Sequence, residues 1–199
     1  MVSDTAPDPD SAPLILAFDT SAAHCAAALV RGEAVIARRD EAMDRGQAER
    51  LLTMLEEMLA EAGSGWAALD GIGVVTGPGN FTGVRLAVAA ARGLALALRI
   101  PAVGVSVFEA LADRPGEVTI TIADKRGRFS QAFRDGSPLG PPAEVTDETS
   151  AGPSRTDPVV VARIAARRLA TASPPAPLYL RPADALPSSD PVPVLLDDA

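Results

Sequence analysis

The chain has 199 residues, of which 47% are hydrophobic, and its 18 Lys and Arg against 26 Asp and Glu give a net charge of −8. This length and apolar content exclude a disordered chain and indicate a folded protein with a substantial core. The acidic balance argues against a protein that grips nucleic acid with its own surface, so any role with RNA is expected to be indirect. The single cysteine excludes an internal disulfide and a cysteine-rich metal site, and we expect a cytoplasmic protein.

The first third of the chain predicts a leader and a small antiparallel sheet. Residues 1–13 are acidic and proline-rich and lack the cationic and apolar regions of a signal peptide, so we expect a disordered leader. Three apolar runs follow in close succession, separated by polar turn residues, at 14–18, 25–30 and 34–37. This pattern predicts a three-stranded meander.

Polar side chains stand where the first of these runs ends. Asp19 is a candidate site residue because function in α/β sheets is usually found at strand ends. The plainer interpretation is a carboxylate that stabilises the turn. His24 lies beside Cys25, but adjacent strand residues face opposite sides and no second ligand pair exists, so we predict no metal site.

Residues 47–62 have the pattern of an amphipathic helix. Apolar side chains recur at every third or fourth position, glutamates lie opposite them, and Gly63 follows as a stop signal. The apolar arc is wide enough to contact two surfaces.

A strand, a tight turn and a long helix are predicted within 71–98. The apolar run 72–75 indicates a buried strand, and the Gly77–Asn80 turn ends it. The helix that starts at Thr82 leaves backbone amides unpaired, so this junction can hold an anion. It can also be only a turn, because the Walker and Rossmann glycine spacings are both absent.

The helix over 82–98 is apolar in nearly every direction. Its charges are Arg85 and Arg92, with Arg99 just beyond, and their seven-residue spacing places them on one narrow strip. Such a helix is buried on more than one side, either in the core of this chain or against a partner. We expect it to be too short to cross a membrane.

The second half repeats the strand and acidic corner. A strand at 101–105 leads to a helix that Ser106 caps, and two strands at 118–122 and 129–133 then flank a turn at Asp124. This echo of Asp19 indicates two related lobes with a cleft between their acidic turns. The rest is predicted as a loop at 136–142, a helix at 159–170 and a proline-rich end. The expected divisions are 14–106 for the first lobe, 107–181 for a smaller second lobe and 182–199 for the tail.

The chain contains, in this order, the stretches ILAFDTS, AERLLTMLEEML, TGPGNFTGVRLAVAAARGLALAL, VGVSVFEAL, ADKRGRF and PLYLR. In order and spacing these six motifs resemble the TsaB (YeaZ) family of tRNA threonylcarbamoyladenosine biosynthesis proteins. The resemblance covers most of residues 14–181. It implies the fold class, an α/β two-lobed fold of the actin-like, sugar-kinase and Hsp70 type (ASKHA), with mixed sheets flanked by helices and a truncated second lobe.

The family resemblance also implies a function. Its members bind and activate the ligase TsaD and act with the ATPase TsaE. The complex transfers a threonylcarbamoyl group to the adenosine beside the anticodon of tRNAs that read ANN codons. This chain is then a non-catalytic scaffold subunit that contacts tRNA only indirectly and has no membrane association.

The resemblance carries two groups of site residues. Asp19 and Asp124 match the acidic phosphate corners of the superfamily, which implies a vestigial phosphate site for ATP or ADP with magnesium, although no cofactor is expected for the chain alone. That site consists of Asp19, Thr20, Gly77, Gly79, Asn80 and Asp124. The two apolar helices are expected to form a ledge that binds TsaD, or a second copy of the chain in isolation. The expected interface residues are Leu51, Met54, Leu55, Met58, Arg85, Val88 and Arg92.

An enzymatic alternative stays open. The chain would then be a small sugar-kinase-like phosphotransferase that uses Asp19 and Asp124 around a magnesium-nucleotide. The chain has one histidine and therefore lacks the paired histidines of a TsaD-like metal site, and it offers no nucleophile with a spare base. These gaps favour the non-catalytic subunit.

Overall fold

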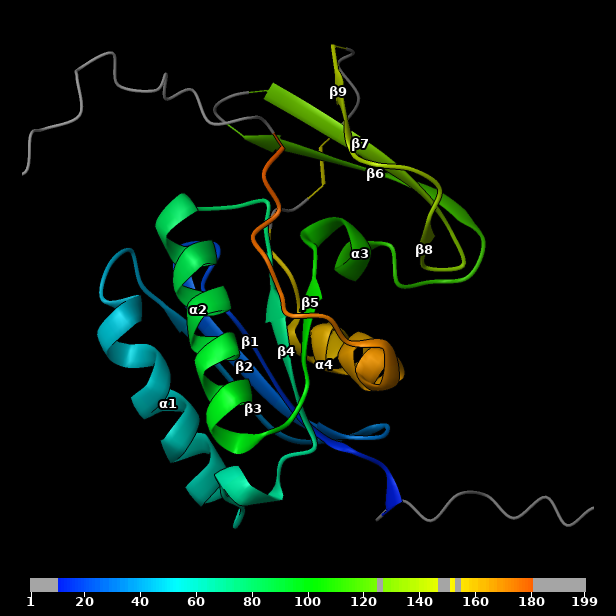
Figure 1. Cartoon of the computed structure of the whole chain (residues 1–199). Helices are drawn as coiled ribbons and strands as arrows, with labels where there is room; N and C mark the ends of the chain where they lie inside the picture. The colour runs from blue at the N-terminus through cyan, green and yellow to red at the C-terminus, as the bar shows by residue number, and fades with distance from the viewer. Residues whose placement is uncertain (1–10, 125–126, 147–150, 153–154, 181–199) are drawn as a thin grey trace, which may run out of the picture.

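Two β-sheets organise the computed structural model, which describes residues 11–124, 127–146, 151–152 and 155–180 (Figure 1). The first sheet has the strand order β3-β2-β1-β4-β5, and in the second β7 pairs with β6, β8 and β9. The strands are β1 Leu14–Asp19, β2 His24–Arg31, β3 Ala34–Ala42, β4 Gly71–Val75, β5 Ala102–Val105, β6 Glu117–Asp124, β7 Gly127–Arg134, β8 Ser137–Pro138 and β9 Ala143–Val145. The helices are α1 Gln47–Glu61, α2 Phe81–Leu98, α3 Val107–Leu111 and α4 Pro158–Arg168, with short 3-10 turns η2 Trp66–Ala68 and η3 Leu169–Thr171.

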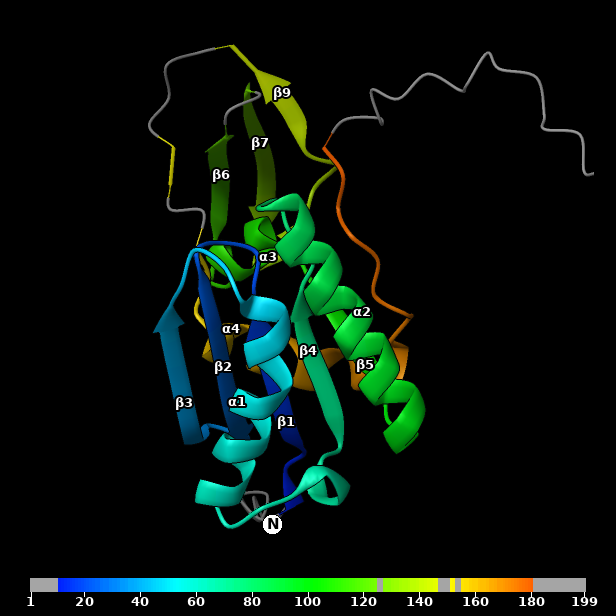
Figure 2. The same ribbon diagram turned by 90° about the vertical axis from the view of Figure 1, so that its left-hand side faces the viewer.

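The first sheet combines the predicted meander with a parallel half. β1, β2 and β3 pair antiparallel, as predicted, and β4 and β5 run parallel to β1. Helices cover both faces of this sheet: α1 and α2 lie side by side along one face, and α4 crosses the other (Figures 1 and 2). The sheet is therefore the middle layer of a sandwich, which agrees with the α/β class expected from the sequence.

Residues of β1 alternate between two cores. Leu14, Leu16 and Phe18 join the core beneath α1 and α2, whereas Ile15 and Ala17 join the core that α4 shares with α3 and the second sheet. This period of two follows from the pleat of a strand that is covered on both faces. The same alternation decides which face Asp19 meets at the end of β1.

The strand pattern differs from the sequence-based expectation at two places. β3 extends to Ala42 because Arg39 and Glu41 form ion pairs with α1, which compensates for the lack of apolar side chains there. β8 and β9 were expected to be loop or unassigned, and they form through backbone pairing with β7. Strands of two or three residues that form through backbone pairing show no alternation of apolar and polar side chains, so the sequence does not reveal them.

The second half of the chain contributes to the core of the first sheet. α4 follows residue 106 in sequence, yet it packs against β1, β2 and β4. The two expected lobes thus share a core, and the division at 106/107 stays a prediction. The expected leader and tail also stay predictions, because residues 1–10 and 182–199 lie outside the described part.

Helix α2 was expected to be too short to cross a membrane. Among the described residues it is the one helix that is long and apolar enough, by length and composition alone, to cross a membrane, so the expectation that it is too short was wrong. In this fold it packs instead on β4 and β5, through a stripe that includes Val84, Ala87 and Ala91. It is therefore a layer of the α/β sandwich.

Five of the seven residues expected at a partner interface lie in the core instead. Leu51, Met54, Leu55 and Met58 of α1 are at most 1% exposed and belong to the core between the helices and the sheet, and Val88 of α2 is 3% exposed. Arg85 and Arg92 are exposed. The sheet takes the most apolar stripe of each helix, so a partner meets only the residues outside that stripe.

Two neighbouring leucines of α1 test this assignment. We expect Leu55→Ala to lower the free energy of unfolding by about 2–5 kcal/mol, because the fully buried side chain leaves a cavity. Leu52, which is 50% exposed, is the matched control, and Leu52→Ala should cost less than about 0.5 kcal/mol. Urea denaturation measures both, and equal losses would contradict the assigned face.

Candidate functional site

A buried polar cluster occupies the corner between β1 and β2. Asp19 and Thr20 are 0% exposed, and Ser21 and His24 are 1% exposed. Asp19 accepts hydrogen bonds from the Ser21 amide at 2.7 Å and from the Thr156 hydroxyl at 2.9 Å. The carboxylate expected to face a nucleotide is therefore turned into the protein, where it joins the β1–β2 corner to the segment before α4.

His24 is the neighbour of the Asp19 carboxylate on the β2 side of this cluster. Its Nε2 lies 3.2 Å from the Asp19 Oδ2, an electrostatic contact without the alignment of a hydrogen bond. Burial by itself raises the pKa of Asp19, but the contacts with His24 and Ser21 outweigh burial and hold the pKa of this carboxyl below its usual value. Asp19 is therefore a stable carboxylate inside the fold.

The sequence could not reveal Thr156. Its contact with Asp19 joins residues 137 positions apart, and no motif surrounds it. The contact exists because odd-numbered residues of β1 face the α4 side of the sheet.

Asp19, Ser21 and His24 are the residue types of a hydrolytic triad, and the fold brings them together. The Ser21 hydroxyl has no hydrogen-bond partner, so it is not paired with the imidazole as an activated nucleophile would be. All three side chains are also closed to solvent, and a substrate could not reach them. Neighbouring Cys25 points into the other core, where burial raises the pKa of its thiol to about 12.

The glycine loop before α2 docks on this same corner. The Asn80 amide donates to the Ser21 carbonyl at 2.6 Å, and the Thr20 hydroxyl donates to the Gly83 carbonyl at 2.7 Å. A Cβ on Gly79 or Gly83 would collide with the backbone of the corner. These glycines therefore permit a close approach between two backbones, a role other than phosphate binding.

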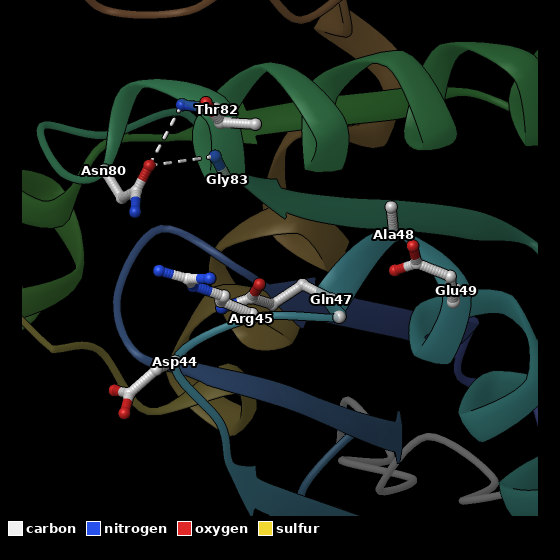
Figure 3. Close-up of a pocket in the computed structure, with 9 residues that line it drawn as sticks. Asp44, Arg45, Gln47, Ala48, Glu49, Asn80, Thr82 and Gly83 are labelled. Carbon is white, nitrogen blue, oxygen red and sulfur yellow. Dashed lines mark hydrogen bonds between the residues drawn. The ribbon is translucent and has the colours of Figure 1, made fainter.

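The amides expected to hold a phosphate are used within the loop. The Asn80 side chain accepts from the Thr82 amide at 3.0 Å and from the Gly83 amide at 3.4 Å, as an N-cap (Figure 3). Gly77 has a φ of 95°, and its carbonyl accepts from the Val107 amide at 2.8 Å. Asp124 ends β6 in the second sheet, and Lys125 and Arg126 after it lie outside the described residues.

The six residues expected to form a phosphate site therefore do not make one visible unit. Asp19 and Thr20 are buried, and the loop of Gly77, Gly79 and Asn80 is packed on them. Nucleotide binding stays a prediction.

A cavity of about 270 Å³ opens beside the loop, between the starts of α1 and α2. Its lining includes Arg45 and Gln47 from the α1 side and Asn80 and Thr82 from the α2 side (Figure 3). Helix N-termini favour anions, but the carboxylates of Asp44 and Glu49 also line this cavity. Within the part of the chain that the structure describes, no group of three or more His, Cys, Asp or Glu side chains could hold a metal ion.

The outer face of α1 and α2 is the second candidate site. We use "outer face" for the exposed residues of the two helices that point away from the sheet, and its large apolar members are Leu52, Phe81 and Leu96, which are 50%, 53% and 83% exposed. At the start of α2, the Arg85 guanidinium lies 3.6 Å from the centre of the Phe81 ring and its Nε donates to the Tyr179 hydroxyl at 2.8 Å. Arginine and exposed aromatic side chains are typical of protein interfaces.

The fold and these two sites define the class of protein: a mixed α/β protein of the actin-like, sugar-kinase and Hsp70 (ASKHA) type. The model of the family "TsaD: tRNA N6-adenosine threonylcarbamoyltransferase" matches residues 34–122. Two solved structures superpose on the chain with 26% sequence identity. One, "YeaZ from Pseudomonas aeruginosa", has a TM-score of 0.68 and covers 84% of this chain and 100% of its own. The other, titled as an uncharacterized protein with similarity to peptidase YEAZ from Pseudomonas aeruginosa, has a TM-score of 0.72 and covers 85% and 100%.

Curated relatives agree with these structures. The chain is 37% identical over 130 residues to the tRNA threonylcarbamoyladenosine biosynthesis protein TsaB of Haemophilus influenzae, covering 61% of this chain and 54% of the relative. An uncharacterized protein of Mycobacterium tuberculosis is 32% identical over 145 residues, covering 70% and 69%. The chain therefore belongs to the TsaB (YeaZ) family. It spans about half the length of the TsaB relatives it matches.

Two glycines of α2 separate packing from helix propensity. We expect Gly83→Ala to lower the free energy of unfolding by about 1–3 kcal/mol, because the new methyl group meets the Thr20 carbonyl. Gly93 has nothing within 4 Å of its Cβ position, so Gly93→Ala should raise the free energy of unfolding by about 0.5–1 kcal/mol. Thermal or urea unfolding measures both, and a Gly83→Ala variant at least as stable as wild type would refute the docked corner.

Acid stability tests the Asp19 carboxylate. Its pKa is lower in the folded than in the unfolded chain, so its stabilisation is present above the unfolded pKa of about 4 and is lost as the pH falls through the folded value. We expect Asp19→Asn to be less stable than wild type at pH 7 and to lose less stability below pH 4, with a slope smaller by up to about 1.4 kcal/mol per pH unit. Parallel curves of unfolding free energy against pH would contradict this.

Proposed function

We propose that this chain is a non-catalytic subunit in tRNA threonylcarbamoyladenosine biosynthesis that binds and activates TsaD. Its relatives in Haemophilus influenzae and Escherichia coli carry the name of that pathway. The TsaD family model covers residues 34–122, a range that contains both α1 and α2. A TsaD partner with an equivalent helix pair could therefore meet this one face to face.

The observation that carries the proposal is the exposed outer face. α2 is composed almost wholly of apolar and small residues, yet only 28% of it is buried inside the chain. Each exposed apolar side chain that a partner covers contributes roughly 25 cal/mol per Å². Exposed apolar patches of this kind mark binding sites for proteins.

The buried cluster supports a subunit over a phosphotransferase. A kinase needs a carboxylate that reaches magnesium, but both oxygens of Asp19 are occupied by groups of the chain itself. In this proposal the chain supplies no catalytic group and needs no cofactor of its own. TsaE joins through the complex, tRNA is contacted indirectly, the setting is the cytoplasm, and a homodimer can form when TsaD is absent.

Reconstitution tests the function, and an exposed leucine tests the face. With purified TsaD and TsaE, tRNA modification should stall when this chain is omitted and resume when it is added. Leu96→Asp should raise the Kd for TsaD by at least about tenfold, because it puts a charge on the most exposed large apolar side chain of the outer face. Calorimetry or size-exclusion chromatography measures the binding.

Leu139 provides the matched control for that experiment. It is 54% exposed and follows β8, beside the second sheet, so Leu139→Asp should bind TsaD like wild type. Modification that proceeds equally well without this chain would refute the function. Equal loss of binding in the two variants would refute the face.

A further inference from the structure

One strip of α2 is exposed along the whole helix. Its members follow one another at spacings of three or four residues, which places them on one side of the helix: Phe81, Arg85, Ala89, Arg92 and Leu96. All five are exposed, and the exposed C-cap residue Arg99 continues their line. We call these six residues the α2 strip. It forms part of the outer face.

The charges of the α2 strip are all positive and have no carboxylate beside them. Arginines elsewhere pair with carboxylates, as Arg39 and Arg50 do beside β3. Arg92 and Arg99 have no side-chain partner among the described residues, although Leu96, which is 83% exposed, lies between them. An exposed leucine between two guanidinium groups fits a segment that combines apolar side chains with carboxylates.

Residues 172–180 bring the chain to the start of this strip. They run beside α2 and reach its first turn (Figures 1 and 2). There the Tyr179 hydroxyl accepts from the Arg85 Nε at 2.8 Å, and the centre of the Tyr179 ring lies 6.2 Å from that of Phe81. The Leu178 amide donates to the Thr76 carbonyl at 2.8 Å and fixes the segment from the side of the sheet. The tail, 182–199, therefore begins close to the strip.

The tail has the composition that the strip calls for. It lies outside the described residues, but its sequence shows that every charged residue within 182–199 is an aspartate. Its longest run of large apolar residues, 194–196, stands directly before Asp197 and Asp198. Leucines next to two carboxylates thus match the arrangement of Leu96 between two arginines.

We infer that residues 182–199 fold back along α2 and cover the strip, with Leu195 and Leu196 on Leu96 and the aspartates beside the arginines. The tail is long enough, because α2 rises only about 17 Å from Arg85 to Leu96 and about fifteen extended residues span up to about 50 Å.

Attachment to the same chain favours the tail over other occupants. It gives the tail an effective concentration in the millimolar range, which a second copy in dilute solution does not reach. The tail also brings only carboxylates to the strip, whereas the outer face of a second copy brings arginines as well as glutamates. A docked tail competes with any partner for the outer face, so it lowers the apparent affinity of that partner by the fraction of covered molecules. This consequence rests on the proposed function.

Disulfide trapping in the full chain tests the docking without a partner. The test pair combines Leu196→Cys with Leu96→Cys. The matched control combines Leu196→Cys with Leu139→Cys, because Leu139 is 54% exposed but follows β8 beside the second sheet. Native Cys25 is 0% exposed and stays out of the reaction.

We expect the test pair to close an intramolecular disulfide at least about tenfold faster than the control in dilute protein at low salt. About 0.5 M NaCl, or Asp197→Lys with Asp198→Lys, should reduce this advantage to less than about threefold, because the attraction to the arginines is screened or reversed. Non-reducing electrophoresis and titration of free thiols measure closure, and circular dichroism checks that the variants are folded.

Two results would overturn the inference. One is equal closure rates for the two pairs, and the other is a disulfide that joins two copies, since the strip would then hold a second copy. Neither result bears on the proposed function, which reconstitution with TsaD tests. With docking confirmed, Asp197→Lys with Asp198→Lys in the otherwise native chain should lower the Kd for TsaD by about threefold, because the competing tail is released. An unchanged Kd would overturn the competition.

Discussion

The close approach of two backbones, the Thr20–Ser21 corner and the Gly79–Gly83 loop, determines most of the arrangement. It fixes where α2 starts, through hydrogen bonds of 2.6 and 2.7 Å that no side chain larger than hydrogen would permit at Gly79 or Gly83. Because α2 starts there, its stripe of Val84, Ala87 and Ala91 meets β4 and β5. The opposite side of the helix is left in solvent, with Leu96, Arg85 and Arg92.

The same corner explains why an acidic strand end is not a nucleotide site here. Asp19 lies on the α4 side of β1, and its partners Ser21, His24 and Thr156 come from three segments of the chain. A buried carboxylate is stable only when it is paired in this way. The residues that resemble a phosphate corner thus serve to hold the β1–β2 turn, the segment before α4 and the start of α2 together.

Charged side chains are paired where two elements of the chain pack together and are unpaired on the outer face. Where β3 meets α1, Arg39 and Arg50 each pair with carboxylates, and these pairs hold the polar second half of the edge strand β3 against the helix. On the outer face, Arg92, Glu49 and Glu56 have no ion-pair partner among the described residues, and Arg85 contacts the neutral side chains of Phe81 and Tyr179. A surface with unpaired charges and exposed apolar side chains has the anatomy of a protein interface, with an apolar core and a polar rim.

The sequence by itself determined the local elements: the meander, the strand–turn–helix at 71–98, the helix capped by Ser106, and the family through its motifs. Periodicity and turn residues carry that information because they act over a few residues. Only the tertiary structure decided which stripe of each helix is buried, and so moved Leu55 and Val88 into the core and left Leu52 and Leu96 outside. It also decided the partners of Asp19, because a contact across 137 residues depends on how layers pack and leaves no local pattern. The glycine loop before α2 therefore has a packing role, and the surface of α2 that faces solvent is set by what its other side must bury.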